Sequence, residues 1–279
     1  MVQQLDCAGK YLDLSTPKVM GILNVTPDSF SDGGRFSTID LAIQQTAKML
    51  DQGAAIIDVG GESTRPGADD VSVNEELDRV IPVIEKITSE FDVIVSIDTS
   101  KPAVISAAVE AGASFINDVN ALRADGAIEA AVRANVPVCL MHMQGMPRTM
   151  QTAPTYEHVT NDIVAFLNER VRSCVDAGIR HEQLLIDPGF GFGKTLEQNC
   201  QLMGELDKFA ALELPLLIGV SRKSMIGKIL DTDVDDRLLG SVALETLAVW
   251  QGANIIRAHD VAAARDAIKI AVAVKLANL

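Results

Sequence analysis

The chain has 279 residues, of which 24 are basic and 38 are acidic, so its net charge at pH 7 is −14 and its pI is ≈ 4.7. Such a chain lacks the basic face that binding to nucleic acids or to anionic membranes requires, so we exclude both as partners. Hydrophobic residues make up 48% of the chain and charged residues 22%, a balance typical of a globular protein rather than a disordered one.

The cysteines and the N-terminal segment indicate the cellular compartment in which we expect the protein. The four cysteines are scattered and form no CxxC pair, so we expect neither a zinc site nor a disulfide framework. Asp6, Lys10 and Asp13 interrupt the first segment, which is therefore not expected to be a signal peptide. No apolar run approaches the ~18 residues of a membrane span. We expect a cytoplasmic protein with no membrane segment.

Short apolar runs rich in β-branched residues recur along the chain, and a stretch of helical periodicity follows most of them. This alternation predicts parallel strands that are buried on both faces and covered by helices. In chain order, the expected strands span residues 19–24, 55–59, 93–98, 114–117, 136–141, 184–187, 216–219 and 254–258. The expected helices span residues 38–52, 74–90, 102–111, 156–177, 196–209 and 241–251.

Eight strand units in this length give a repeat of about 35 residues, close to the spacing of a (β/α)8 barrel. The alternative is a doubly wound open sheet, which would place its main glycine-rich turn after the first strand. That turn reads NVTPDSF over residues 24–30 instead. We therefore predict an α/β protein that forms a single TIM barrel domain over residues 1–279. Residues 1–17 are expected to form a short hairpin that closes the barrel floor.

Polar or charged residues stand at the carboxyl end of every expected strand. In barrels, the strand ends and the loops that follow them converge on this face and carry the active site. A single buried Asp could equally be a satisfied core group, but eight coincident strand ends indicate a functional site. The residues are Asn24, Asp58, Asp98, Asn117, His142, Asp187, Ser221 with Arg222 and Lys223, and Arg257 with His259.

Two long loops and a group of cations belong to the same face. The loops, residues 25–37 and 60–72, are rich in turn residues, and loops of this length over a barrel mouth often act as lids. Grouped cations in so acidic a chain predict a local positive site that fits a phosphate or diphosphate. These cations are Arg65, Arg222, Lys223, Arg257 and His259.

A glycine-rich stretch over residues 188–195 follows a strand and precedes an expected helix. It is not a phosphate-binding loop, because Pro188 replaces the first glycine of that motif. We expect a flexible loop that carries aromatic residues.

Two long signatures resemble the dihydropteroate synthases, a family of pterin-binding barrels: GILNVTPDSFSDGG at residues 21–34 and GAAIIDVGGESTRPG at residues 53–67. Shorter matches are SIDT at 96–99, IND at 116–118, MHM at 141–143, DPGFGFGK at 187–194, GVSRKS at 219–224 and RAHD at 257–260. The resemblance covers essentially the whole chain, with no departure from the family pattern.

The resemblance implies condensation of 6-hydroxymethyl-7,8-dihydropterin diphosphate with p-aminobenzoate, which releases 7,8-dihydropteroate and diphosphate. It also implies a Mg²⁺ cofactor and a homodimer. A dissociative substitution at the pterin methylene fits this chemistry, because diphosphate is a good leaving group and the pterin ring stabilises a cation on the methylene carbon.

The resemblance assigns residues to each part of the site. Pterin binding is implied for Asp98, Asn117, Met141, Asp187, Phe192, Gly219, Lys223 and Arg257. Diphosphate binding is implied for Asn24, Thr64, Arg65, Arg257 and His259, and Asn24 is also the implied metal ligand. p-Aminobenzoate binding is implied for Phe30, Thr64, Pro66, Lys223 and Ser224. The implied catalytic residues are Asp98, Arg65, Lys223, Arg257 and His259.

Two other functions remain compatible with a pterin-binding barrel. A methyltetrahydrofolate-binding methyltransferase domain shares the carboxylates for the pterin edge but needs no diphosphate site. A non-catalytic pterin-binding subunit could lose the loop cations without penalty. The presence of Asn24, Arg65, Lys223, Arg257 and His259 favours the synthase.

Overall fold

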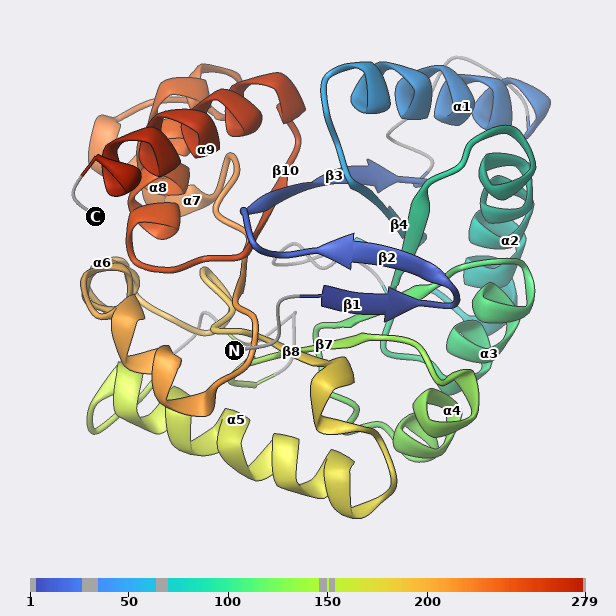
Figure 1. Ribbon diagram of the computed structural model, residues 1–279, viewed down its shortest axis with the longest axis horizontal. Coiled ribbons are helices and arrows are strands. Elements are labelled where there is room, and N and C mark those ends of the chain that lie inside the picture. The colour runs from blue at the N-terminus through green and yellow to red at the C-terminus, as the bar shows by residue number, and fades with distance from the viewer. Residues whose placement is uncertain (1–3, 27–34, 64–69, 146–149, 151–153, 278–279) are drawn as a thin grey trace.

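Eight parallel strands surround one interior in the computed structural model, which describes residues 4–26, 35–63, 70–145, 150 and 154–277 (Figure 1). The strands are β3 (Lys18–Asn24), β4 (Ile56–Gly60), β5 (Ile94–Asp98), β6 (Phe115–Asp118), β7 (Val138–Met141), β8 (Leu184–Asp187), β9 (Leu217–Ile218) and β10 (Ile255–Ala258). They pair in the order β8-β7-β6-β5-β4-β3-β10-β9, and a parallel bridge from Ile186 to Leu216 joins the two ends. The predicted (β/α)8 barrel is confirmed.

Helices surround the barrel on its outside (Figure 1). They are α1 (Arg35–Asp51), α2 (Val73–Glu90), α3 (Pro102–Glu110), α4 (Ala127–Ala134), α5 (Val159–Asp176), α6 (Leu196–Gly204), α7 (Ser224–Leu230), α8 (Leu238–Trp250) and α9 (Val261–Leu276). Short 3₁₀ turns span His181–Gln183, Leu206–Leu212 and Val234–Asp236. None of these described helices is long and apolar enough to span a bilayer.

The helix predictions were incomplete. Periodicity missed α4 and α7, which are only 8 and 7 residues long, and α9, which is too rich in apolar residues to show two distinct faces. The helix expected over residues 196–209 ends at Gly204, and the chain then tightens into a 3₁₀ turn. Glycine is a poor residue for continuing an α-helix, which accounts for the break.

An apolar layer closes the floor of the barrel. Each strand contributes one inward-facing residue: Met20, Ile56, Ile94, Phe115, Cys139, Leu185, Leu217 and Ile255. The N-terminal hairpin, β1 (Gln4–Cys7) with β2 (Lys10–Asp13), packs Leu5, Cys7 and Leu12 against this layer. Figure 1 shows the hairpin lying across the barrel opening. The expected floor hairpin is therefore confirmed.

The layer above the floor follows from strand geometry. Side chains of a strand alternate between two faces, so the residue two positions after each floor residue also points into the barrel. Those residues are Ile22, Asp58, Ser96, Asn117, Met141, Asp187, Gly219 and Arg257. Five of these eight residues are polar or charged, so the interior changes from an apolar floor to a mostly polar layer over one step along the strands.

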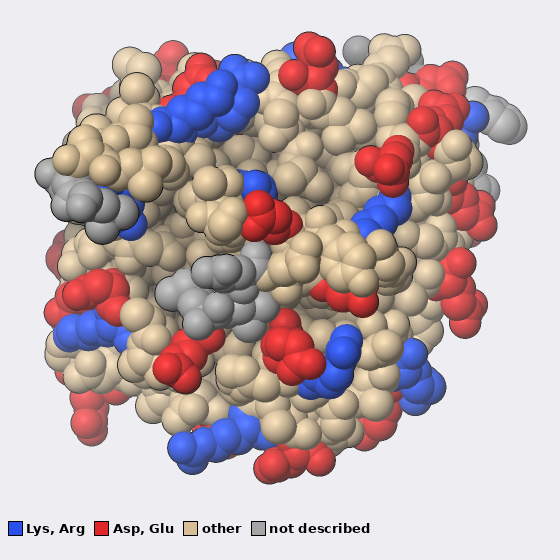
Figure 2. All heavy atoms as spheres, viewed as in Figure 1, with Lys and Arg blue, Asp and Glu red and all other residues tan. Residues whose placement is uncertain are grey.

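The face with the hairpin, viewed in Figure 2, carries acidic and basic side chains scattered among neutral ones. The coloured atoms form no continuous basic area on this face. This agrees with the net charge of −14.

Candidate active site

A cleft opens above the polar layer, at the carboxyl ends of the strands. All eight residues expected to bind a pterin line it. The lining residues are Ile22, Asp98, Asn117, Val119, Met141, Asp187, Phe192, Gly219, Ser221, Lys223, Arg257 and His259. Acids, bases and apolar groups therefore meet in one cavity, although they come from separate strands and loops.

Arg257 joins two carboxylates at the base of the cleft. Its Nε donates to Asp58 Oδ2 at 2.6 Å, and its Nη2 donates to Asp98 Oδ2 at 2.8 Å. Burial alone would lower the pKa of the guanidinium, but the carboxylates of Asp58 and Asp98 outweigh it and raise that pKa. Arg257 is consequently a permanent cation.

The two carboxylates that line the cleft hold protons more tightly than usual. Burial raises the pKa of Asp98 to about 7, opposed by Arg257 and assisted by Asp58. Burial also raises the pKa of Asp187, while Lys223 opposes the shift. Raised pKa values of buried carboxyl groups in a cleft are a frequent property of groups that bind or react.

Lys223 faces these acids from the start of α7. Its Nζ donates to the carbonyl of Phe190 and lies 4.4 Å from the ring centroid of Phe192. Burial lowers the pKa of Lys223 to about 8, partly offset by Asp187. The residue is thus a cleft donor that loses its charge only slightly above neutral pH.

The glycine-rich loop between β8 and α6 was expected to be flexible, but several side-chain hydrogen bonds hold it in place. Lys194 Nζ lies 2.7 Å from Gly189 O, 3.0 Å from Phe192 O and 3.1 Å from His142 Nδ1. Asn199 accepts from Gly191 N and donates to Lys194 O. Thr195 caps α6 in a reciprocal capping box, which ends the loop.

His142 lies beneath this loop and does not line the cleft. Its ring contacts Lys194 and packs edge-on against Phe166 at 4.9 Å. Burial, followed by the positive charges of Lys194 and Arg123, lowers the pKa of His142 to about 2. His142 is thus neutral, and its position at a strand end did not make it a site residue.

Arg222 also departs from expectation. It forms a bidentate pair with Asp260, with both N–O distances at 2.8 Å, and this pairing raises its pKa. Its charge is therefore neutralised outside the cleft. Of the predicted cations, Lys223, Arg257 and His259 line the cleft, and His259 Nδ1 is 3.1 Å from Ser221 Oγ.

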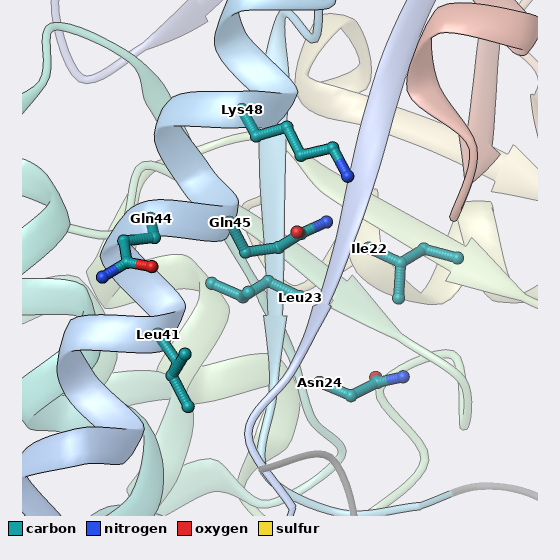
Figure 3. Close-up of a pocket in the computed structure, with 7 residues that line it drawn as sticks. All are labelled: Ile22, Leu23, Asn24, Leu41, Gln44, Gln45 and Lys48. Carbon is teal, nitrogen blue, oxygen red and sulfur yellow. The ribbon is translucent and has the colours of Figure 1, made fainter.

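Asn24 lies beside the cleft, in a neighbouring pocket between β3 and α1 (Figure 3). Ile22 and Asn24 leave β3 on the side opposite α1, whereas Leu23 points toward the helix. A Cβ on Gly60 would lie 3.7 Å from both Asn24 Oδ1 and Asp98 Oδ2, which is ordinary van der Waals distance, so both side-chain oxygens lie close to this glycine. Asn24 is therefore close to the acids of the cleft.

Several expected site residues are placed elsewhere or not described. Phe30, Thr64, Arg65 and Pro66 lie outside the described residues. Ser224 is exposed at the first residue of α7 and does not line the cleft. Within the described chain, no three His, Cys, Asp or Glu side chains form a metal-binding group.

The sequence analysis does not name Ile22 and Val119, which line the cleft, and it gives no individual role to Asp58 or Lys194. Asp58 carries a recognisable signal, because it stands two positions after the floor residue Ile56 and so must face the interior. Lys194 carries no such signal, since its contacts depend on how the loop folds over His142.

Comparison with known proteins adds an independent finding. The sequence profile of the family described as pterin binding enzyme matches residues 20–259. The dihydropteroate synthase of Haemophilus influenzae is 53% identical over 94% of this chain and 95% of its own length.

Two solved structures have similar folds. Dihydropteroate synthase from Yersinia pestis in a sulfonamide drug complex has a TM-score of 0.93 and 52% identity, over 98% of this chain and 99% of its own. The enzyme from Xanthomonas albilineans with 4-aminobenzoic acid has a TM-score of 0.93 and 48% identity, over 99% of both chains.

Proposed function

Because the chain belongs to the pterin-binding enzyme family, among its dihydropteroate synthases, we propose how the described cleft performs their reaction. The enzyme is a transferase that condenses 6-hydroxymethyl-7,8-dihydropterin diphosphate with p-aminobenzoate. The products are 7,8-dihydropteroate and diphosphate. The observation that carries the proposal is the convergence of all eight expected pterin-binding residues on one cleft.

The polar groups of the cleft match the edge of a dihydropterin. Asp98 and Asp187 accept hydrogen bonds from its guanidine-like N–H groups, and Lys223 donates to its carbonyl. Because the nitrogen of Asn117 donates to Asp58 at 3.1 Å, the amide oxygen is the atom left to accept from the ligand. Met141 and Phe192 pack on the ring, and the planar guanidinium of Arg257 stacks on its face.

The bond that breaks joins the pterin methylene carbon to the diphosphate oxygen. Both electrons leave with the oxygen, so positive charge remains on the methylene and spreads into the ring. Arg257 and His259, with Arg65, stabilise the departing anion, while Asp98 stabilises the cation. The amine nitrogen of p-aminobenzoate then bonds to the methylene and loses a proton. This dissociative order needs no nucleophilic side chain.

The side chain of Asn24 would hold the Mg²⁺ that the family resemblance implies. Mg²⁺ prefers oxygen ligands, retains several waters and often binds through substrate phosphates and few protein groups. One amide oxygen beside the cleft, close to the carboxylate of Asp98, suits such a shared site better than a closed protein cage. When bound, the ion would neutralise charge on the diphosphate.

The p-aminobenzoate pocket is proposed to form beside Lys223. The lysine provides a positive charge for the carboxylate of this substrate, and Ser224 follows it at the exposed start of α7. Phe30, Thr64 and Pro66, which lie outside the described residues, are proposed to contribute to the same pocket.

A homodimer is proposed through an exposed apolar surface on α8 and α9, which lie together at one side of the barrel (Figure 1). The α8–α9 face consists of Leu239, Leu247 and Trp250 on α8 and of Ile270 and Val274 on α9. Leu239 is 80% exposed. Exposed apolar side chains grouped on two adjacent helices favour contact with a second copy of the chain.

A cytoplasmic, single-domain enzyme is proposed as well. All four cysteines are free thiols, and Cys200 is exposed, which suits a reducing compartment.

The proposed site is tested with Asp187→Ala and, as a control, with Asp176→Ala at the exposed end of α5. We expect dihydropteroate formation by the parent enzyme to require Mg²⁺. Asp187→Ala should abolish calorimetric binding of the pterin diphosphate, and Asp176→Ala should not. Unchanged affinity in Asp187→Ala would contradict the assignment.

Arg65→Ala should reduce kcat more than pterin affinity, and equal losses would count against a role after binding.

The dimer is tested by sedimentation of Leu239→Asp, with Val175→Asp on α5 as a control at another exposed apolar site. We expect only Leu239→Asp to give a monomer. A parent enzyme that sediments as a monomer would overturn the proposal.

A further inference from the structure

We propose that Asp58 is a positioning residue of the reaction. It orients Arg257 and Asn117 for the pterin, and it stays paired with Arg257 when Asp98 turns to the substrate. This inference rests on the proposed assignment of Asp98, Asn117 and Arg257 to pterin binding.

The position of Asp58 separates it from the residues that touch substrate. Its side chain is 0% exposed, and it does not line the cleft. Its Oδ2 accepts from Arg257 Nε at 2.6 Å and from Asn117 Nδ2 at 3.1 Å. One buried oxygen therefore holds two cleft residues at once.

The contact with Asn117 decides which end of the amide serves the ligand. A carboxylate can only accept hydrogen bonds, so it binds the amide nitrogen and leaves the amide oxygen as the acceptor. A pterin edge presents N–H groups, which need that acceptor. An amide in place of Asp58 could donate as well as accept, and Asn117 would then lose its fixed orientation.

The contact with Arg257 decides what happens when substrate arrives. In the structure, Arg257 divides its donors between Asp58 and Asp98, and only Asp98 lines the cleft. Pterin binding engages Asp98, so a guanidinium paired with Asp98 alone would lose its partner or compete with the ligand. Asp58 keeps Arg257 paired while substrate is bound, because Asp58 does not line the cleft and the ligand does not contact it.

The Oδ1 of Asp58, unpaired in the described chain, also indicates that this residue serves function rather than stability. Asp58 Oδ1 has no hydrogen-bond partner among the described residues, although the side chain is fully buried. Burying an unsatisfied carboxylate oxygen is unfavourable, and an apolar side chain would avoid that penalty. The advantage of an aspartate at position 58 must therefore come from the hydrogen bonds that its Oδ2 accepts from Arg257 and Asn117.

The test compares Asp58→Asn, which keeps the shape and removes the charge, with Ser96→Ala. Ser96 is the register partner of Asp58 on β5, is equally buried, and its Oγ also has no hydrogen-bond partner in the described chain. We expect kcat/KM for the pterin diphosphate to fall about 10- to 100-fold in Asp58→Asn, which corresponds to about 1.4 to 2.7 kcal/mol. KM for p-aminobenzoate should stay within about twofold, and Ser96→Ala should change neither quantity by more than that.

The pH profile gives a readout that a loss of folding would not move. Asp98 is affected by Arg257, Asp58, Glu76 and Asp118, and it also faces Lys223. Removing the negative charge of Asp58 frees Arg257 to pair more strongly with Asp98. The acidic limb of kcat/KM for the pterin should therefore move to lower pH in Asp58→Asn.

Arg257→Gln separates this inference from the assignment on which it rests. If Asp58 acts through Arg257, most of the effect of Asp58→Asn disappears in the Arg257→Gln background. A strong effect of Arg257→Gln, with Asp58→Asn unchanged in both kcat/KM and pH profile, overturns the role of Asp58 alone. No effect of Arg257→Gln overturns the site assignment. If Asp58→Asn does not fold, Asp58→Glu is measured in the same assays, and pterin affinity equal to that of the parent enzyme overturns the proposal.

Discussion

Replacing Gly189 by Ala tests how closely the loop after β8 must approach β7. Gly189 has φ +70°, and its carbonyl accepts from Lys194 while its N–H donates to Asp187 Oδ1 at 2.7 Å. A Cβ at this position would lie 1.9 Å from the backbone oxygen of His142. The backbone at His142 and the backbone at Gly189 cannot easily move apart, because His142 N also donates to Asp187 O at 2.9 Å.

The expected effect has two parts. A side chain in the left-handed region costs roughly 1–2 kcal/mol. Overlap with a neighbouring backbone typically adds about 1–3 kcal/mol. Gly9→Ala is a matched control, because Gly9 has φ +87° in the hairpin turn and a Cβ added there would meet nothing within 4 Å among the described residues. Gly9→Ala should therefore lose only the stability that a side chain in the left-handed region costs, roughly 1–2 kcal/mol.

Urea unfolding measures the stability of both variants, and calorimetry measures their affinity for the pterin diphosphate. We expect Gly189→Ala to lose about 2–5 kcal/mol of unfolding free energy and Gly9→Ala about 1–2 kcal/mol. Displacement of Asp187 should weaken pterin binding about tenfold or more in Gly189→Ala only. Equal stability losses with unchanged pterin affinity would refute the idea that this close approach shapes the cleft.

Two further predictions concern titratable groups. First, kcat/KM for the pterin should rise as pH increases through the pKa of Asp98, about 7, and fall through that of Lys223, about 8, because the acid must be ionised and the lysine protonated. Lys223→Arg should remove the alkaline limb, since a guanidinium stays charged, and an unchanged limb would exclude Lys223 as its source. Second, burial, followed by Asp260, raises the pKa of Glu245 to about 7, so the folded state binds its proton more tightly than the unfolded chain. The resulting loss of stability is absent at pH values below the ordinary pKa of 4.5 and develops as pH rises toward about 7. Glu245→Gln should therefore add up to about 3 kcal/mol to the unfolding free energy at alkaline pH and nothing at acidic pH, and a gain independent of pH would contradict this.

The sequence was sufficient for the barrel and for the composition of its mouth. Continuous apolar runs are required wherever a strand is buried on both faces, and eight of them occur at barrel spacing. The alternation of side chains then fixes which residues face inward. Ile56 followed by Asp58, and Leu185 followed by Asp187, already specify an apolar floor below a polar layer.

Residues next to one another in sequence nevertheless took different roles. Arg222 and Lys223 are adjacent, yet Arg222 has a left-handed backbone, with φ +56°, and pairs with Asp260, while Lys223 lines the cleft. The sequence contains no local signal for this difference. Asp260 lies 38 positions away and becomes a partner only when β10 completes the barrel.

The chain itself determined the type and order of its elements, because those depend on periodic patterns between near neighbours. Only the tertiary structure decided that Arg257 would bond Asp58, 199 positions away, and that Lys194 would bond His142, 52 positions away. Charge, burial and hydrogen bonding depend on distances in space. Those distances are set by closure of the barrel, which no local pattern encodes.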